Sequence, residues 1–421
     1  MIEFALAAIT AVFVYRVLRS NFKLGFAIFF LDVIFAWWLP SGIQITSVAG
    51  TNIFLADLIF LASIVLFVQS SRELSESFPL LFKLTLGISF IFAISLCRGI
   101  FIFGLQPAIN ESRLIIYPIA SLMWGLYSSK KICPRFSDLR LIATFIAICM
   151  LSVEIVNVVL HGFGSASDIQ LVDGSILNLR PLVHIQALSL LAAFSILLIC
   201  AFDEIKHRGR NSLLAAAALI GIFISQQRSV LVATIATFSA LLFQRRTALL
   251  GALTLILGLF FALFIPWSSV TFIPHELRSS LADSSSNLTT FIARSGSWIQ
   301  YLNSFRNWDL VDQLLGKPFG TGWGRYDGAN NLWVEFNPHN WYLILLLRTG
   351  FVGAVLFIIL YIKKVVVAIK VGPRGYGLFL IQLQHLIFQY FYPMPWQIVQ
   401  VVAIRNSELE ESPPEKRNSI S

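Results

Sequence analysis

Residues 320–353 read GTGWGRYDGANNLWVEFNPHNWYLILLLRTGFVG, and this stretch decides how the rest of the chain is interpreted. A glycine-rich approach ends in the tripeptide PHN, and an apolar run with a GxxG pair follows it. About 20 consecutive apolar residues cross a bilayer as a helix, so residues 341–362 predict a membrane-spanning helix. His339 then lies at the mouth of that helix, in contact with water. Because imidazole titrates near neutral pH, His339 is a candidate for proton transfer on a lipid-borne substrate.

Composition extends this membrane assignment to the whole chain. Hydrophobic residues make up 57% of the 421 residues and charged residues 13%, and the mean hydropathy is +0.77. These values lie outside the range of soluble proteins. We therefore expect an all-α, polytopic integral membrane protein with about 12 transmembrane helices of roughly 20 residues each, which excludes a soluble domain on a single anchor. The net charge of +9 requires no nucleic acid as a partner, because the distribution of the basic residues explains it.

Apolar windows with the length of a span recur along the chain. They cover residues 4–18, 24–39, 53–70, 79–97, 114–129, 139–160, 182–203, 212–227, 229–244, 247–267, 341–362 and 376–392. No small-residue cleavage site follows the first window, so we expect it to be retained rather than removed as a signal peptide. Pro393 and Pro395 interrupt the apolar sequence after the last window, which is read either as one span or as a hairpin.

Lysine and arginine gather in alternate connections between these windows. Their members are Arg16, Arg19 and Lys23; Arg72; Lys130, Lys131 and Arg135; Lys206, Arg208 and Arg210; Arg245 and Arg246; and Lys363, Lys364, Lys370 and Arg374. Residues 40–52, by contrast, contain no lysine or arginine. The positive-inside rule assigns the basic connections to the cytoplasm. The N-terminus then lies outside, and residues 267–339 form a large periplasmic loop.

The four cysteines, Cys97, Cys133, Cys149 and Cys200, are scattered along the chain. Their spacing matches neither a metal-binding motif nor a disulfide framework. We therefore predict no metal site.

One segment of the long loop has the pattern of an amphipathic helix. Residues 293–308 read ARSGSWIQYLNSFRNW, and Trp298, Tyr301 and Phe305 recur near helical spacing. A helix that lies on the membrane surface explains this pattern, and that interpretation leaves room for a functional Arg294.

Arg228 separates two apolar runs with almost no linker. A guanidinium in that place is costly unless it reaches the interface or has an anionic partner. The first interpretation is simple snorkelling. The second is capture of a lipid-linked phosphate or diphosphate, since the planar fork of arginine suits paired oxygens.

Taken in order, four pieces of the C-terminal half resemble the O-antigen ligase and O-antigen polymerase superfamily. The pieces are SQQRSVLVATIATF, ARSGSWIQYLNSF, GKPFGTGWGRYDG, and PHN followed by GFVG. They lie within about a third of the chain, near residues 220–362. Gln227 departs from the family pattern, which more often has serine or another small residue there, and this departure does not affect the match of Arg228. The matched positions are Arg228; Arg294 with Trp298; Gly320, Gly322 and Gly324; His339 with Asn340; and Gly350 with Gly353.

The resemblance implies a glycosyltransferase in the bacterial inner membrane, whose donor is an undecaprenyl-diphosphate-linked glycan and whose acceptor is a sugar hydroxyl. It implies no nucleotide sugar, no metal and no other cofactor. Arg228 and Arg294 would bind the diphosphate, Asn340 would contact substrate, and His339 would act as the general base. The chain then divides into N-terminal transmembrane helices (1–210), a catalytic region (211–405) that holds the periplasmic loop (268–339), and a disordered polar tail (406–421).

Further residues near the outer side are candidates with simpler alternatives. Arg180 and His184 would meet the acceptor or the carrier phosphate, or else anchor a span at the interface. Arg325 would bind phosphate, or else is an ordinary loop residue. The glycines at residues 320–324 permit a tight turn whose amides approach the substrate. They are not a nucleotide-binding fingerprint, because no strand–helix unit surrounds them.

Within the family we favour a polymerase of O-antigen or exopolysaccharide repeat units over a ligase that joins glycan to lipid A core. A flippase and a chain-length regulator are the expected protein partners of a polymerase. The rival class is a transporter or flippase of lipid-linked oligosaccharides, which charged residues inside spans would serve. A purely structural membrane subunit is the third hypothesis. The charged residues within predicted spans are Asp32, Asp57, Lys83 and Glu154.

The topology predicts that residues 267–339 lie outside the cytoplasm. A periplasm-dependent reporter fused near Ser285 should be active, and a reporter that functions only in the cytoplasm should be silent there. The opposite result would overturn both the topology and the site.

Overall fold

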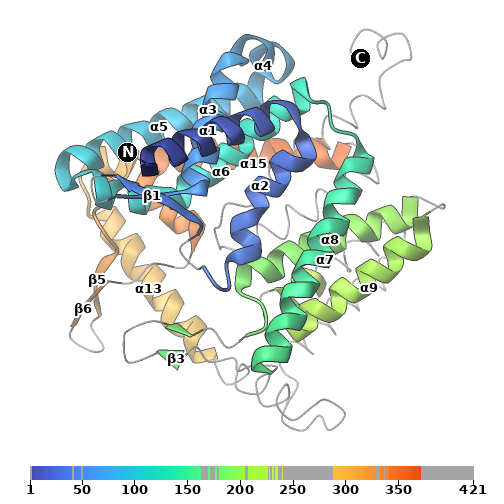
Figure 1. Cartoon of the computed structure of the whole chain (residues 1–421). Coiled ribbons are helices and arrows are strands. Elements are labelled where there is room, and N and C mark those ends of the chain that lie inside the picture. The colour runs from blue at the N-terminus through green and yellow to red at the C-terminus, as the bar shows by residue number, and fades with distance from the viewer. Residues whose placement is uncertain are drawn as a thin grey trace.

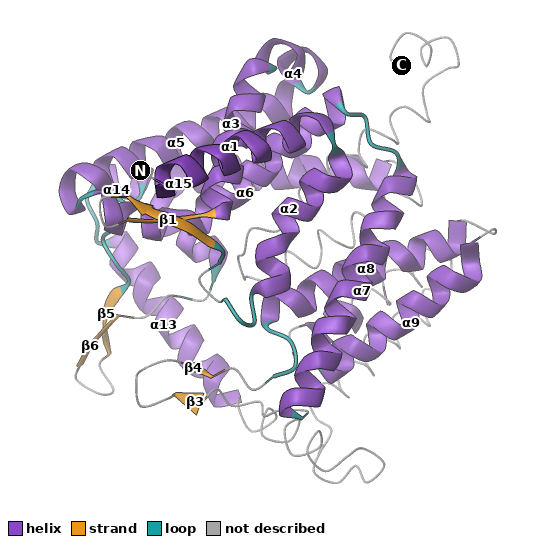
Figure 2. Cartoon of the chain, viewed as in Figure 1, coloured by secondary structure: helices purple, strands orange, loops and turns teal. Residues whose placement is uncertain are grey.

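The computed structural model is mostly helical (Figures 1 and 2). It describes residues 2–39, 42–48, 51–162, 169–170, 176–177, 180–203, 207–225, 227, 230–231, 233–235, 239, 288–327, 332–335, 338 and 340–370. The helices are α1 (Ile2–Ser20), α2 (Phe22–Phe35), α3 (Leu55–Gln69), α4 (Ser71–Ser77), α5 (Pro79–Phe103), α6 (Leu105–Lys131), α7 (Phe136–His161), α8 (His184–Asp203), α9 (Arg208–Ile224), α13 (Leu288–Arg306), α14 (Leu310–Leu315) and α15 (Trp341–Lys370). Three antiparallel hairpins pair β1 (Gln44–Val48) with β2 (Thr51–Phe54), β3 (Ile169–Gln170) with β4 (Ile176–Leu177), and β5 (Gly324–Asp327) with β6 (Leu332–Glu335).

The helices form two packed groups (Figure 1). In one group α6 packs between α3 and α5, with α1 against α3 and α15 against α5. In the other group α8 packs against α7 and α9. Helix α2 contacts both groups, since it touches α1 and α3 as well as α7 and α8. The indole of Trp124 is fully buried, and its Nε1 donates to the Leu18 carbonyl at 2.8 Å, which joins α6 to α1.

Four helices of the described chain are long and apolar enough to span a membrane: Pro79–Phe103, Ser137–His161, His184–Ala201 and Trp341–Lys363. Helices α3 and α4 would add a fifth span if they count as one, but they bend by 74°. Such helices fit a membrane protein. About twelve spans are not confirmed. Helix α2 has 14 residues and reaches only about 21 Å, short of a bilayer core of about 30 Å. The predicted spans 247–267 and 376–392 lie outside the described residues.

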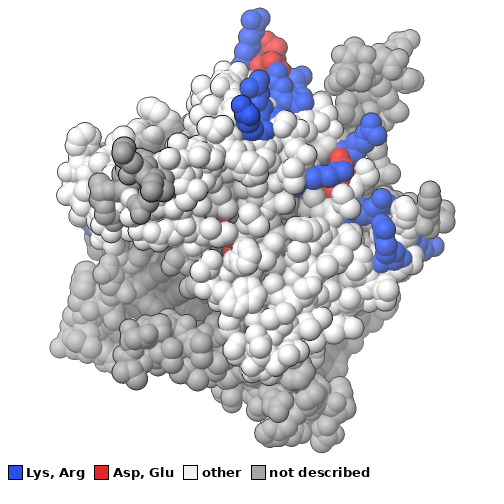
Figure 3. All heavy atoms as spheres, viewed as in Figure 1, with Lys and Arg blue, Asp and Glu red and all other residues white. Residues whose placement is uncertain are grey.

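Connections that the charge pattern assigns to one side also lie together in space. Lys23 pairs with Asp138 at 3.0 Å, and Lys131 pairs with Glu73 at 2.5 Å. These pairs join the start of α2 to the start of α7, and the end of α6 to α4. Figure 3 shows lysine and arginine gathered along the upper and right edges of the view, over α4 and the ends of α7 and α9, while most other described atoms in view are uncharged.

The connections poor in basic residues meet at the opposite helix ends. Arg113 Nη2 donates to the Asn52 carbonyl at 2.5 Å, which ties α6 to the β1–β2 hairpin. Trp37 Nε1 donates to the Arg180 carbonyl at 3.0 Å, which ties the end of α2 to the start of α8. The long connection before α15 reaches the same end, because the Gly320 amide donates to Glu111 at 2.5 Å.

The connection before α15, residues 267–339, contains the helix that we expected from its amphipathic pattern. Helix α13 covers the predicted residues 293–308 up to Arg306 and begins earlier, at Leu288. It does not stand apart from the bundle, because Tyr301 is buried in a cluster with Leu343 and Leu347 of α15. Helix α14 and the β5–β6 hairpin follow it.

The apolar run predicted as one continuous helix over residues 341–362 is broken. Gly350 has φ 63° and ψ −168°, so two helical pieces meet there. The break makes room for the chain after α14, since a Cβ on Gly350 would lie 2.3 Å from the Leu314 carbonyl carbon. Just before the break, the Leu347 carbonyl accepts a hydrogen bond from the Lys317 amide at 2.9 Å. Non-helical backbone at membrane depth requires such a partner. Hydrophobic periodicity does not report a break that depends on a segment elsewhere in the chain.

Gly350→Ala should destabilise the protein, because its Cβ would meet backbone and its φ would be strained. We expect a loss of about 1–3 kcal/mol, measured as a fall of several degrees in the apparent unfolding temperature of purified protein in detergent. The matched control is Gly296→Ala in α13, where the added Cβ has no atom of the described residues within 4 Å apart from its own helix backbone and chain neighbours. That change should be neutral or stabilising by up to about 1 kcal/mol. Equal behaviour of the two variants would contradict the packing described here.

Candidate functional site

The start of α15 is held on both sides of His339, which itself lies outside the described residues. Asn340 caps the helix: its Oδ1 accepts from the Leu343 amide at 3.2 Å, and its carbonyl accepts from the Ile344 amide at 2.9 Å. Pro338 is buried, and its carbonyl accepts from Trp298 Nε1 at 2.7 Å. The side-chain oxygen of Asn340 already caps the helix. This hydrogen bond competes with the predicted contact of Asn340 with substrate.

Helix α13 carries the second predicted group. Arg294 lies four residues before Trp298, so the two positions share one face of the helix. That face meets the Pro338 segment through the Trp298 indole. The side chain of Arg294 lies outside the described residues. The hydrogen bond of the Trp298 indole thus brings the part of α13 that carries the Arg294 position to the region of the residue before His339.

The glycine-rich segment forms a tight turn. Gly320 and Gly322 have φ values of +94° and +76°, a left-handed conformation that glycine adopts without steric strain. Their amides donate to Glu111 Oε2 at 2.5 Å and 3.4 Å. The predicted approach of these amides to a substrate therefore meets a carboxylate of the protein itself. Gly324 and Arg325 open strand β5 opposite Glu335 and Val334, and the Arg325 side chain is not among those described.

A buried arginine completes this turn. Arg348 of α15 is 2% exposed and pairs with Glu111. Its Nη2 also donates to the Gly322 carbonyl at 2.5 Å, and its guanidinium carbon lies 4.0 Å from the centre of the Trp323 ring. Sequence reasoning missed both charged residues. The available signal was the single arginine inside the apolar run WYLILLLRTGFVG, because a charge within a span needs a buried partner.

A second ion pair fixes the segment before the turn to α5. Arg98 Nη2 pairs with Asp312 of α14 at 2.6 Å, and Arg98 Nη1 donates to the Gly316 carbonyl at 2.8 Å. The segment from α14 to the turn therefore contacts α5, α6 and α15 through charged side chains.

Arg180 and His184 belong to a different group of contacts, at the start of α8. Arg180 Nη1 donates to Gln227 Oε1 at 3.0 Å, and Gln227 Nε2 donates to the Leu182 carbonyl at 3.2 Å. His184 is the first residue of α8. Arg228 lies outside the described residues, but its neighbour Gln227 is bonded to Arg180. Gln227, which precedes Arg228 in the sequence, therefore holds the side chain of Arg180, another predicted binding position.

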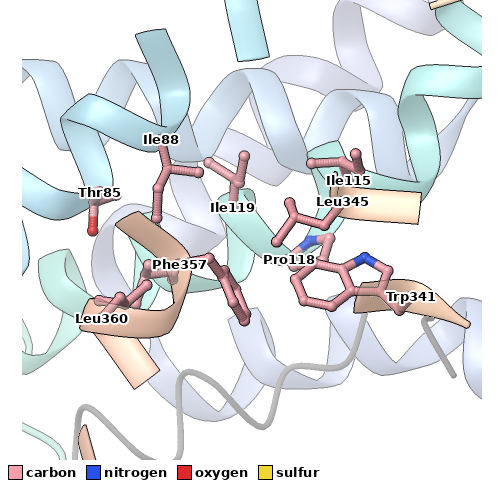
Figure 4. A pocket seen from close by; sticks show the side chains of 10 residues that line it. Thr85, Ile88, Ile115, Pro118, Ile119, Trp341, Leu345, Phe357 and Leu360 are labelled. Atoms are coloured by element: carbon pink, nitrogen blue, oxygen red, sulfur yellow. The ribbon is translucent and has the colours of Figure 1, made fainter. Parts of the chain in front are cut away.

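An apolar pocket lies between α5, α6 and α15, beside the start of α15 (Figure 4). Its walls include Ile88 of α5, Pro118 and Ile119 of α6, and Trp341 and Phe357 of α15. Trp341 directly follows Asn340, so the pocket begins next to the residues that cap the helix. Its lining is almost entirely apolar, and its space holds no more than about one water molecule.

Within the described residues no group of three or more His, Cys, Asp or Glu side chains is arranged to hold a metal ion. No family model matches the chain, and no curated protein matches it. The family resemblance and the roles that it implies therefore stay predictions.

Proposed function

We propose that this chain is a membrane glycan polymerase, which transfers repeat units from a polyprenyl-diphosphate carrier onto a growing O-antigen or exopolysaccharide chain. The observation that carries the proposal is the hydrogen bond from Trp298 to the Pro338 carbonyl. It ties the helix of Arg294, a proposed diphosphate ligand, to the residue before His339, the proposed base. We further propose about twelve spans in a bacterial inner membrane, with residues 268–339 on the periplasmic side.

The proposed chemistry is a direct displacement at the anomeric carbon of the donor sugar. The acceptor hydroxyl forms the new glycosidic bond while the bond from that carbon to the diphosphate oxygen breaks. His339 takes the hydroxyl proton, and the polyprenyl diphosphate leaves with the electron pair. Arg228 and Arg294 stabilise the negative charge on the leaving group, which bidentate guanidinium groups do well. This displacement inverts the anomeric centre.

The walls of the pocket beside Trp341 are apolar, and the space between them holds no more than about one water molecule. In this proposal the chain of the carrier therefore lies against the apolar outer surface of the helices while its diphosphate lies at the mouth of α15. The end of the bundle opposite the basic connections, where the β1–β2 hairpin and the glycine turn each hydrogen-bond to α6, supplies the surface from which the sugar portions extend.

Polymerase and ligase share this arrangement and differ in the acceptor. Purified protein with a lipid-linked repeat unit as the sole substrate separates them. A polymerase forms a ladder of longer lipid-linked chains, whereas a ligase forms product only when lipid A core is added.

A transporter is the second candidate, and one observation favours it. Glu154 of α7 is 3% exposed, and no atom of the described residues forms a hydrogen bond with its Oε1. The other carboxylates predicted within spans are bound, Asp57 by Arg113 at 2.7 Å and Asp32 by the Ile43 amide at 3.0 Å. Proteoliposomes that move a lipid-linked glycan across the bilayer without forming a new glycosidic bond would decide for transport.

His339→Gln should abolish most of the transfer, since glutamine keeps hydrogen bonding but cannot accept the proton. General-base catalysis contributes about 10²–10⁴-fold, so we expect a loss of that size in rate, with donor binding retained. The measurement is the pH–rate profile of purified protein with a lipid-linked donor. His207→Gln, before α9 at the basic end of the bundle, is the control and should leave the rate unchanged. Near-normal turnover of His339→Gln with an unaltered pH profile would make the imidazole structural.

Arg228→Lys and Arg294→Lys should each produce much less glycan than the wild-type protein. The lysine ammonium is a point charge and lacks the bidentate geometry of the guanidinium. We expect each to lose most of the glycan product at near-normal protein level. Arg72→Lys is the matched control, since that side chain is 92% exposed and far from the proposed chemistry. Full glycan production by Arg228→Ala or Arg294→Ala would remove that residue from the mechanism.

A further inference from the structure

The mechanism above gives no role to the buried ion pair of Glu111 and Arg348. Glu111 of α6 and Arg348 of α15 are separated by 237 residues in the sequence, and their side chains are 8% and 3% exposed. Removing two charges from water costs about as much as their attraction returns, so stability alone gives little reason for such a pair. Its polar atoms are instead directed at one segment of the chain.

That segment is the glycine turn. Glu111 accepts the amides of Gly320 and Gly322, while Arg348 donates to the Gly322 carbonyl and stacks on Trp323. The pair therefore holds both polar faces of the turn backbone, its donors and its acceptor. Such a clamp fixes the turn relative to both α6 and α15.

The turn is connected in its own right to α13. The hydroxyl of Tyr301 donates to the Trp323 carbonyl at 2.7 Å. Tyr301 lies three residues after Trp298, which holds the Pro338 carbonyl. A continuous path of contacts thus runs from Glu111 and Arg348 through the turn and α13 to the residue before His339.

We propose that Glu111 and Arg348 are positioning residues for glycan transfer, which set the glycine turn and, through Tyr301 and Trp298, the placement of α13 against Pro338, the residue before the proposed base. The proposal rests on the proposed function. Neither side chain touches substrate in this scheme. Displacing a reacting group by about 1 Å can cost 10²-fold in rate, so loss of the pair should act on kcat rather than on donor KM.

Glu111→Gln tests the pair directly, because glutamine is isosteric but lacks the charge. Amide hydrogen exchange at Gly320 and Gly322 should speed up about 10-fold or more, since neutral acceptors bind more weakly than a carboxylate. The kcat should fall about 100-fold with little change in donor KM. Glu76→Gln is the matched control: its partner Arg72 forms an exposed pair within one helix, and neither readout should move.

Tyr301→Phe keeps the proposal testable if Glu111→Gln folds poorly, because it removes one hydrogen bond and no buried charge. We expect its kcat to fall about 10-fold or more with an unchanged exchange rate at Gly320. Tyr15→Phe is the control, since it removes a comparable hydrogen bond, the one from Tyr15 of α1 to Gln69 of α3 at 2.9 Å. It should leave kcat at the wild-type value.

Three results would overturn the proposal. Unchanged exchange at Gly320 and Gly322 in Glu111→Gln would show that the pair does not hold the turn. Normal kcat in both Glu111→Gln and Tyr301→Phe would reduce the pair to a packing feature. A wild-type protein that transfers no glycan from a lipid-linked donor would contradict both the proposed function and the positioning role. Amide exchange at Gly320 and Gly322 would then test only whether the ion pair holds the turn.

Discussion

An α-helix that breaks inside an apolar layer leaves backbone groups without their usual partners, and in this chain the break falls at Gly350 of α15. An unpaired carbonyl in such a layer costs several kcal/mol. The amide of Lys317 supplies the partner to Leu347, so the segment after α14 must enter between α5 and α15. The glycine turn then follows directly, against Glu111 of α6. Backbone satisfaction at a single break therefore accounts for the path of the connection that leads to the proposed site.

The ion pairs at the two ends of the bundle differ in burial, and the difference is informative. Lys131 with Glu73 lies at the basic end with side chains 38% and 47% exposed, where screening by water leaves a pair with little energetic effect. At the other end, two ion pairs are largely buried: Arg113 with Asp57, and Arg348 with Glu111. Buried pairs act through geometry, because each depends on hydrogen bonds in fixed directions. The end that needs fixed geometry is the end to which the proposed chemistry is assigned.

Sequence patterns captured features that depend on near neighbours. The aromatic spacing around Trp298 predicted α13, and the apolar run after Asn340 predicted the start of α15. Features that depend on distant residues were missed. Arg348 finds its partner 237 residues away, and the break at Gly350 exists because Leu314 lies against it. The number of spans is a different case, since the predicted spans 247–267 and 376–392 lie outside the described residues and the count stays a prediction.

The two groups of predicted residues are held by different means, and this bears on how the proposed site works. Arg180 is hydrogen-bonded to Gln227, whose side chain also donates a hydrogen bond to the Leu182 carbonyl. This group therefore belongs to the packed group of α7, α8 and α9. The group around Pro338 is held by α13, which is itself held by the glycine turn. A donor that contacts both groups would bridge an element of the bundle and an element of the long connection. Transfer would then require both to be in place, which is why a buried clamp on the turn matters for a reaction whose charged groups lie elsewhere.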